Sequence, residues 1–360
     1  MTIDTSKMHI EPFAFAGSVG TMTVTEPEGD LNVTLKISTR LSTLFSTQIT
    51  FAYSQTIKID WSSILSSMIS MLDRLYATPK RPIAILDRRM YCEILIGDNT
   101  VRFLLLRGKM DDESLSKAGM GGLLISSRPQ IYRASDNSAV FVYGDLGWES
   151  MPKIMADCYF EHSGMKTFEL YELDRSGFSE FNIGLKNISG LIGGNIPEND
   201  NIVAYDIYTA YIDGSEQKYS DKLRVIVDDR NCYEFSFIGS YGTMESIFAQ
   251  PSEKVKSDFS SDIFVSDGKE SAVRISSAQI HESYSGYIDN SDVSRFWNEF
   301  FASDVKYIIR NGVSHLIAVE SVESERVRGE LASYSFKWHY ADRKDNPDLD
   351  FSRKTLKEYK

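Results

Sequence analysis

The sequence predicts a mainly β protein, made of antiparallel sandwiches with a few amphipathic helices and divided into several domains. Many stretches alternate apolar and polar residues, which is the two-residue period of strands with one buried face. Two stretches instead carry apolar side chains at the three- and four-residue spacing of an amphipathic helix. The chain has 360 residues, more than one ordinary core buries, so we divide it into residues 1–150, 151–230, 231–345 and 346–360.

Residues 1–150 are predicted to form a β-rich domain with one helix. Residues 21–60 alternate like antiparallel strands, and Asp60 is placed to cap a helix over residues 61–76. This helix carries a continuous apolar stripe and ends before Pro79, because a residue that precedes proline disfavours the helical conformation. Three further strands are predicted at residues 82–86, 90–96 and 101–107.

Residues 151–230 are predicted to form an immunoglobulin-like or fibronectin-like β-sandwich. Alternate residues between 203 and 211 share one face of a long strand, and residues 223–227 form the strand that returns beside it. The stretch from residue 188 to residue 201 is rich in glycine and asparagine, so we predict a loop there.

Residues 231–345 are predicted to form a β-domain with a helix over residues 291–302. The helix passes directly into a hairpin, with strands at 305–310 and 313–319 and a type I′ turn at Asn311-Gly312. One apolar stripe on the helix carries Val293, Phe296, Trp297, Phe300 and Phe301.

The same domain ends in a strand whose aromatic side chains share one face, namely Tyr334, Phe336, Trp338 and Tyr340. A platform that stacks carbohydrate is one interpretation of this face. The aromatic stripe of the helix offers a matching surface, so we predict that the two pack together as core. Two further strands, at residues 259–265 and 271–280, are expected around a turn at Asp267-Gly268.

Composition argues against several classes of function. The chain has 51 acidic and 39 basic residues and a net charge of −12, whereas nucleic-acid binding requires basic side chains that neutralise phosphates, so no nucleic-acid groove is expected. Cys92, Cys158 and Cys232 lie far apart in the sequence, which favours buried free thiols over disulfides or a zinc site. No stretch approaches the ~20 apolar residues of a membrane span.

The histidines offer no catalytic pattern, because none lies in an HExxH motif or beside a nucleophile elbow. We therefore expect no enzymatic activity and no catalytic, cofactor or metal site. His315 is predicted to pair with Ile308 across the hairpin as a partly exposed residue, and His339 to lie at the surface beside Lys337. The remaining histidines are His9, His162 and His281.

Part of the third region resembles a known class of proteins. The segments that carry the resemblance are residues 237–247, the helical Phe296-Trp297 pair, residues 302–308 and residues 334–342. In order and spacing they resemble β-rich tail or baseplate structural proteins of phages and prophages of Bacteroides-like bacteria. The resemblance implies a non-enzymatic virion component that is assembled in the host cytoplasm, self-associates and docks on other tail proteins.

A second hypothesis is a glycan-binding or adhesive β-module protein of the bacterial cell surface, with a host-surface glycan as its ligand. Such an adhesin needs a signal peptide or a lipoprotein cysteine. The sequence starts Met1-Thr2-Ile3-Asp4 without an apolar segment, so we expect the tail or baseplate subunit instead.

Residues 346–360 are predicted to be a C-terminal arm that binds a neighbouring subunit. The segment has too few apolar residues for a core of its own, and its basic side chains complement the acidic surface of an identical copy. The residues expected to bind this partner are Phe351, Arg353, Lys354, Lys357 and Tyr359.

Overall fold

A computed structural model of the chain is mainly β, with several antiparallel sheets and three α-helices in its described part, as the sequence predicted. The structure describes residues 1–10, 13–39, 42–76, 85–87, 90–106, 108, 122–124, 128–129, 131–136, 138–144, 152–173, 177–213, 216–227, 232–266, 269–288, 291–327 and 331–341. Of these, 70–76, 85–87, 122–124, 143–144, 177–178, 213, 258–266, 269–278 and 326–327 are described by their backbone alone.

The chain forms two compact units. Unit 1 comprises Met1–Asp228 and Ile238–Ser246, and unit 2 comprises Asp229–Phe237 and Ile247–Lys360. The predicted boundary at residue 230 therefore lies close to the observed division. The return of a short segment to unit 1 was not predicted.

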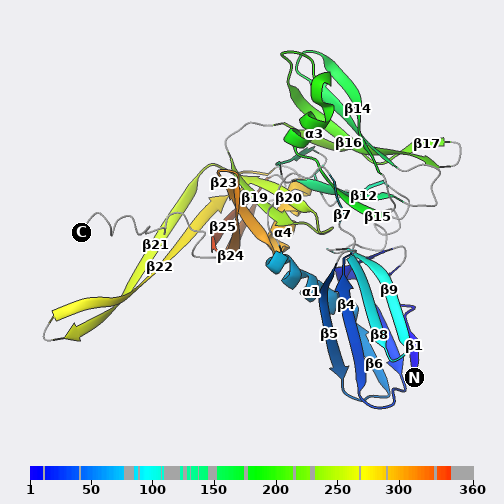
Figure 1. The fold of residues 1–360 in the computed structure, drawn as a ribbon. Helices are drawn as coiled ribbons and strands as arrows, with labels where there is room; N and C mark the ends of the chain where they lie inside the picture. Colours follow the sequence, from blue (N-terminus) through cyan, green and yellow to red (C-terminus); the bar gives the residue numbers. More distant parts are fainter. Residues whose placement is uncertain are drawn as a thin grey trace. The chain divides into compact units, whose positions relative to one another are not determined.

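The first part of unit 1 contains two sheets and a helix, drawn in blue and cyan in Figure 1. The five-stranded sheet has the order β2-β9-β8-β4-β5, and the three-stranded sheet has the order β1-β3-β6. The strands are β1 (Thr2–Asp4), β2 (Ala14–Phe15), β3 (Thr21–Thr25), β4 (Leu31–Ser38), β5 (Thr43–Phe51), β6 (Thr56–Asp60), β8 (Met90–Ile96) and β9 (Asn99–Leu106). A short 3₁₀ helix, η1 (Ala16–Ser18), follows β2.

Helix α1 (Trp61–Tyr76) begins where the sequence predicted it. Asp60 caps it, since its Oδ1 accepts hydrogen bonds from the backbone N–H groups of Ser62 at 3.1 Å and Ser63 at 3.4 Å. Trp61 and Leu65 are buried in the core that both sheets share. The apolar stripe therefore anchors the helix on this core.

The second part of unit 1 contains a four-stranded sheet, β10-β12-β15-β7, and a six-stranded sheet, β11-β18-β16-β13-β14, in which β17 also pairs with β16. The strands are β7 (Ile85–Asp87), β10 (Gly122–Leu124), β11 (Ile131–Arg133), β12 (Ala139–Gly144), β13 (Lys153–Phe160), β14 (Gly164–Glu172), β15 (Gly177–Asn182), β16 (Ile202–Asp213), β17 (Glu216–Tyr219) and β18 (Leu223–Ile226).

The predicted division at residue 150 does not match this pairing. Strand β12 pairs with β15 along its whole length, β7 pairs with the other edge of β15, and β11 pairs in parallel with β18. Residues 151–230 therefore do not form a self-contained sandwich, because three strands of the four-stranded sheet, β7, β10 and β12, come from earlier in the chain. Periodicity identifies strands one at a time and does not identify their partners, which explains the misplaced boundary.

A helix replaces part of the predicted loop between residues 188 and 201. Helix α3 (Leu185–Ile192) is followed by the 3₁₀ helix η2 (Gly193–Asn195). Ile188 and Ile192 are buried, one helical turn apart on the same face. The glycines that suggested a loop thus end a short amphipathic helix, and Gly193 has a positive φ of 58° at its C-terminus.

The segment Ile238–Ser246 belongs to unit 1 because a buried ion pair holds it there. Arg128 donates two hydrogen bonds of 2.5 Å to the carboxylate of Glu245 and a third to the carbonyl of Ala139. Thr243 donates to the same carboxylate at 2.8 Å. The Arg128 and Glu245 side chains are 1% and 0% exposed, so this contact lies within the core of unit 1.

Unit 2 is built on a seven-stranded sheet with the order β20-β19-β23-β24-β25-β22-β21 and carries α4 (Ser291–Ala302). The strands are β19 (Tyr233–Ile238), β20 (Met244–Ala249), β21 (Glu253–Ser266), β22 (Lys269–Tyr284), β23 (Lys306–Arg310), β24 (Val313–Val327) and β25 (Leu331–Tyr340). The predicted hairpin is confirmed, with positive φ at Asn311 and Gly312 and with Ile308 opposite His315. Strand β24 continues eight residues beyond its predicted end at residue 319.

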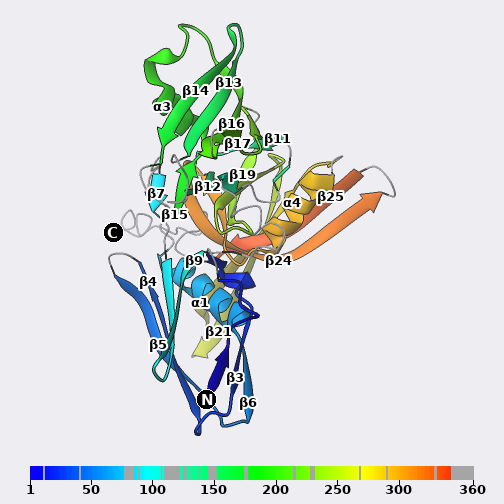
Figure 2. The same cartoon turned by 90° about the vertical axis from the view of Figure 1, so that its right-hand side faces the viewer.

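Helix α4 lies against this sheet (Figure 2), and ring contacts join its aromatic stripe to the aromatic face of the sheet. Phe300 is fully buried, and its ring centroid lies 5.8 Å from those of both Phe235 and Phe336. Trp297 is 2% exposed and contacts Phe336 at 5.8 Å. Because these rings are buried against one another, the interpretation of the helix and strand faces as core is confirmed.

Strands β21 and β22 are longer than predicted and extend past the rest of the sheet as a two-stranded ribbon (Figure 1). They pair with each other from Glu253–Ser283 to Ser266–Lys269. Strand β22 pairs with β25 only over His281–Tyr284. We refer to residues 256–280 as the ribbon.

Candidate interaction surface on the six-stranded sheet

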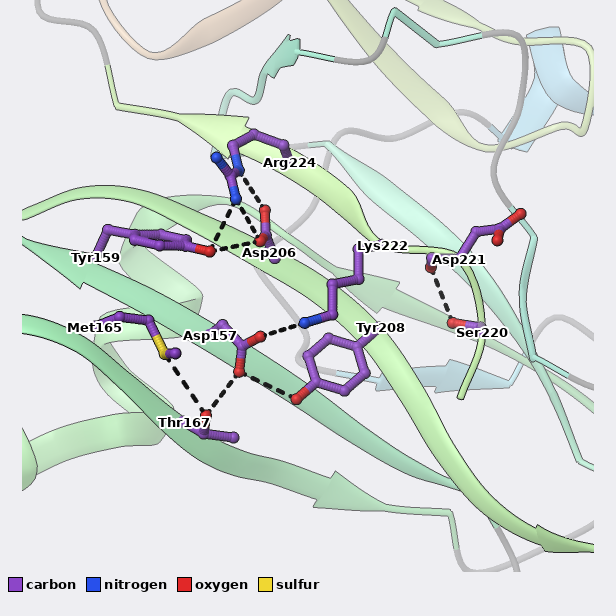
Figure 3. Close-up of polar contacts among 10 residues, drawn as sticks. All are labelled: Asp157, Tyr159, Met165, Thr167, Asp206, Tyr208, Ser220, Asp221, Lys222 and Arg224. Carbon is purple, nitrogen blue, oxygen red and sulfur yellow. Dashed lines mark hydrogen bonds and ion pairs between the residues drawn. The ribbon is translucent and has the colours of Figure 1, made fainter. Parts of the chain in front are cut away.

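The outer face of the six-stranded sheet carries a row of polar side chains across four strands. In β13, Ile154, Ala156 and Cys158 are buried on the core face, so Asp157 lies on the opposite face. Asp157 is the direct partner of Thr167 on β14 and of Asp206 on β16. Asp206 in turn pairs with Arg224 on β18, which completes the row (Figure 3).

Asp157 accepts hydrogen bonds from three side chains. Lys222 Nζ lies 2.6 Å from Oδ2, while Thr167 Oγ1 and Tyr208 OH donate to Oδ1 at 2.7 Å and 3.1 Å. Lys222 Nζ also lies 4.5 Å from the centroid of the Tyr208 ring. Ser220, two residues before Lys222, is held against β16, because its hydroxyl accepts a hydrogen bond from the Thr209 N–H at 2.9 Å. Both carboxylate oxygens of Asp157 therefore accept hydrogen bonds, which come from one cation and two hydroxyls.

Asp206 has a parallel arrangement. Arg224 donates through Nε at 2.5 Å and through a terminal nitrogen at 2.7 Å, so the guanidinium and the carboxylate form a fork. Tyr159 OH donates to the same carboxylate at 2.9 Å, and Arg224 Cζ lies 4.6 Å from the centroid of the Tyr159 ring. Each aspartate thus has one cation and one tyrosine, and each cation covers the ring of that tyrosine.

The charges in this row stabilise one another. Burial raises the pKa of Asp157, but the hydrogen bonds from Lys222, Thr167 and Tyr208 outweigh it and hold that pKa below its usual range. The hydrogen bond with Asp157 raises the pKa of Lys222. Burial and the hydrogen bond to Asp157 raise the pKa of Tyr208 to about 12. At neutral pH Asp157 is therefore a carboxylate, Lys222 a cation and Tyr208 a neutral phenol.

Two carboxylates on directly opposed strand positions repel each other, and the surrounding groups offset this repulsion. The carboxylates are almost fully buried, whereas the side chains of Lys222 and Arg224 are 49% and 44% exposed. The cations therefore present their outer faces to solvent in fixed positions. Tyr219, whose ring lies 5.9 Å from that of Tyr208, is 56% exposed beside them.

This composition is typical of protein-binding surfaces. Tyrosine and arginine contribute most of the energy at many interfaces, and a side chain that is already immobilised loses little entropy on binding. The described residues contain no group of three or more His, Cys, Asp or Glu side chains placed to hold a metal ion. We call Asp157, Tyr159, Asp206, Tyr208, Tyr219, Lys222 and Arg224 the outer-face cluster.

The partner-binding residues predicted from the sequence lie outside the described residues. These are Phe351, Arg353, Lys354, Lys357 and Tyr359, and their role stays a prediction. His315 is half-buried opposite Ile308, as predicted, and His339 lies beside Glu320 at 3.0 Å. Cys92 and Cys158 are buried free thiols, and burial raises the pKa of each to about 12, whereas Cys232 is only half-buried.

Sequence reasoning missed the outer-face cluster, although a signal was present. Asp157 interrupts the apolar run Ile154–Phe160, and Asp206 interrupts the run Ile202–Ile212. A carboxylate inside a long strand with a buried face requires a nearby cation or hydroxyl. The sequence does not identify which of the 39 basic residues supplies it.

No protein-family model matches this chain, and no curated protein matches it either. No helix in the described part of the chain has both the length and the apolar character that crossing a lipid bilayer requires.

Proposed function

We propose that this protein is a non-enzymatic structural subunit of a phage tail, a baseplate or a related injection apparatus. In this proposal it is assembled in the host cytoplasm, resides in the virion, self-associates and docks on other virion proteins. The resemblance of the third region supports the class of particle. The β21–β22 ribbon is the observation that supports a role in assembly.

The ribbon supports this role because of its unpaired edges. Strand β21 is the last strand of its sheet, and none of the described strands pairs with its outer edge. Between residues 269 and 280, β22 has β21 as its only strand partner in the described part of the chain. An isolated two-stranded hairpin is marginally stable in water, and free edges readily accept another strand. A strand from a neighbouring subunit would pair with a free edge and would stabilise the hairpin.

The outer-face cluster supports the same proposal from unit 1. Its half-exposed cations and exposed Tyr219 form a rigid polar and aromatic surface suited to a protein partner. A subunit with two separate binding surfaces can contact two different neighbours. Head-to-tail contacts of this kind generate rings or filaments.

The first test shortens the ribbon and measures the mass of the particles in solution. In the variant, Asn-Gly replaces residues 259–277, so that Asp258 and Ala278, which are partners in the ribbon, are joined by a tight turn. We expect the variant to fold and to assemble more weakly than the wild type at equal concentration, as measured by analytical ultracentrifugation and electron microscopy.

A second variant separates the ribbon from the C-terminal arm. Deleting residues 346–360 tests the predicted arm alone, and it should also leave the units folded while weakening assembly. If the wild-type chain stays monomeric at all concentrations and binds no tail protein, the structural-subunit proposal is wrong. If it assembles equally well without the ribbon, another surface makes the contact.

The second candidate function is glycan binding at a cell surface, favoured by the tyrosines and carboxylates of the outer-face cluster. This candidate ranks lower because Lys222 covers one face of Tyr208 and Arg224 covers one face of Tyr159. Those ring faces are the surfaces on which a sugar would stack. A glycan array tests it: binding that disappears in Tyr219→Ala would favour this candidate.

A further inference from the structure

A buried cluster in unit 2 ties the base of the ribbon to the rest of its sheet. Glu253 begins β21, His281 lies in β22, Arg310 ends β23 and Trp338 lies in β25. Their side chains meet on the face of the sheet that carries α4. We call these four residues the ribbon clamp.

One carboxylate holds two of the other members. Glu253 Oε1 lies 2.5 Å from Nδ1 of His281, and a terminal nitrogen of Arg310 donates to both carboxylate oxygens at 2.8 Å and 2.6 Å. Burial raises the pKa of Glu253, but the His281 hydrogen bond and the charge of Arg310 outweigh it and lower that pKa overall. The carboxylate is therefore charged at neutral pH and accepts hydrogen bonds from both neighbours.

The geometry fixes the protonation state of the His281 nitrogens. A carboxylate only accepts hydrogen bonds, so the Nδ1 atom that faces Glu253 carries the hydrogen. The His281 side chain is 0% exposed, and its Nε2 atom has no hydrogen-bond partner among the described residues. The imidazole also lies flat against Trp338, with ring centroids 4.3 Å apart and an interplanar angle of 14°.

A second proton on His281 would be costly in this position. It would bind at Nε2, where the described residues provide no acceptor, and a buried donor without an acceptor is destabilising. The imidazolium would also share one carboxylate with Arg310, so two positive charges would face a single negative charge in the interior. The other titratable groups nearby are Tyr340, at 5.3 Å from the His281 ring, Tyr233 beside Arg310 and His315 beyond Tyr340.

We propose that His281 makes the ribbon clamp a pH-sensitive latch, in which acid loosens the base of β21 and β22 from β23 and β25. Imidazole is the side chain whose charge ordinarily changes between about pH 5 and pH 8. In the closed clamp, the described residues provide no acceptor for a second imidazole proton. The latch would let the ribbon change position or partner when the surrounding pH falls, whatever the ribbon binds.

Hydrogen exchange on the intact chain tests this latch. The amides to follow are those of residues 253–256 and 281–284, with the amides of β19 as an internal reference in the same unit. After correction for intrinsic exchange, we expect the opening of the clamp segments to increase up to tenfold per pH unit on acidification, as one linked proton requires. Equal changes in the clamp and in β19 would overturn the proposal.

The variant His281→Gln removes the titratable group and keeps a donor that can reach Glu253. We expect its clamp amides to lose the acid response, whereas the matched control His315→Gln keeps it. Retention of the full response in His281→Gln would overturn the proposal.

Tryptophan fluorescence provides a readout that does not depend on a variant at His281. Loosening the clamp removes His281 from the face of Trp338 and lets water reach the indole, so the emission of the wild type should change on acidification and Trp338→Phe should not show that change. If His281→Gln fails to fold, the fluorescence comparison and the hydrogen exchange of the wild type still test the proposal. Unchanged emission together with unchanged exchange of the clamp amides on acidification would overturn it.

Discussion

Two of the arginine–carboxylate forks in the described part of unit 1, Arg128–Glu245 and Arg224–Asp206, are chemically alike and differ in their surroundings. In both, Nε and a terminal nitrogen of the arginine bind the two carboxylate oxygens at 2.5–2.7 Å. Arg128 and Glu245 are 1% and 0% exposed, whereas Arg224 is 44% exposed above a buried Asp206. Both arginines also lie over a tyrosine ring, at 5.0 Å for Arg128 and 4.6 Å for Arg224.

The difference shows that geometry alone does not set the importance of an ion pair. A buried pair attracts strongly, but each partner was stripped of water to form it, so removing one partner leaves a charge that nothing solvates. Water can replace an exposed partner, and salt screens the attraction. We therefore expect the inner fork, Arg128–Glu245, to contribute mainly to stability, and we propose that the outer fork, Arg224–Asp206, contributes to binding.

The largest effect is expected from breaking the inner fork. Arg128→Met leaves the Glu245 carboxylate buried without a cation and removes the hydrogen bond to the Ala139 carbonyl. We expect a loss of about 3–5 kcal/mol in the free energy of unfolding of unit 1. Denaturant unfolding followed by hydrogen exchange in strands of unit 1 measures this loss. A loss below about 1 kcal/mol would show that water reaches Glu245.

Replacing both partners of the inner fork should recover most of that loss. In the double variant Arg128→Met with Glu245→Met, neither charge of the fork remains buried. The two methionine side chains fill a volume similar to that of the side chains they replace, although the Thr243 hydroxyl loses its acceptor. We expect the double variant to be more stable than Arg128→Met alone. The difference between the double variant and the sum of the single variants is the coupling energy. A double variant less stable than either single variant would contradict the comparison.

The outer fork should be much less sensitive. Arg224→Met is expected to cost about 1 kcal/mol or less, because water can reach Asp206 where the guanidinium lay, and Tyr159 still donates to it. The same variant should weaken assembly or partner binding if the outer-face cluster is an interface. Comparing unfolding with assembly in this variant separates the two roles: a loss as large as that of Arg128→Met would remove the distinction.

Acidification should act on the outer-face cluster through Asp157. The pKa of Asp157 is lower in the folded chain than in the unfolded chain, so its contribution is present above the unfolded pKa and is lost as pH falls through the folded one. We expect Asp157→Asn to flatten the dependence of unit 1 stability on pH below about 4, the usual range of aspartate. An unchanged acid limb in this variant would show that other carboxylates govern it.

The smallest effect is expected for a pair on the same sheet in which both partners, and not only the cation, are exposed. Lys153 lies 2.9 Å from Glu169, and their side chains are 41% and 49% exposed. Because both are solvated, Lys153→Gln should not measurably change the unfolding of unit 1, which makes it the control for the outer fork. A clear destabilisation in this control would show that charge removal from the sheet surface is itself harmful.

The sequence by itself determined the local elements of this protein. The aromatic stripe of residues 293–301 predicted α4, the cap at Asp60 predicted the start of α1, and Asn311-Gly312 predicted the turn between β23 and β24. Each of these depends on residues within a few positions of one another, where side-chain spacing and backbone preference act directly. The pairing of His315 with Ile308 followed in the same way.

Only the tertiary structure decided which distant strands pair and which charges meet. Asp157 and Lys222 are 65 residues apart, and Arg128 and Glu245 are 117 residues apart. Strand periodicity is the same for every partner that a strand could take, so it did not reveal that β12 joins β15 across residue 150. Burial of polar groups is settled by such long-range pairing, which is why the two forks and the ribbon clamp emerged from the fold rather than from the sequence.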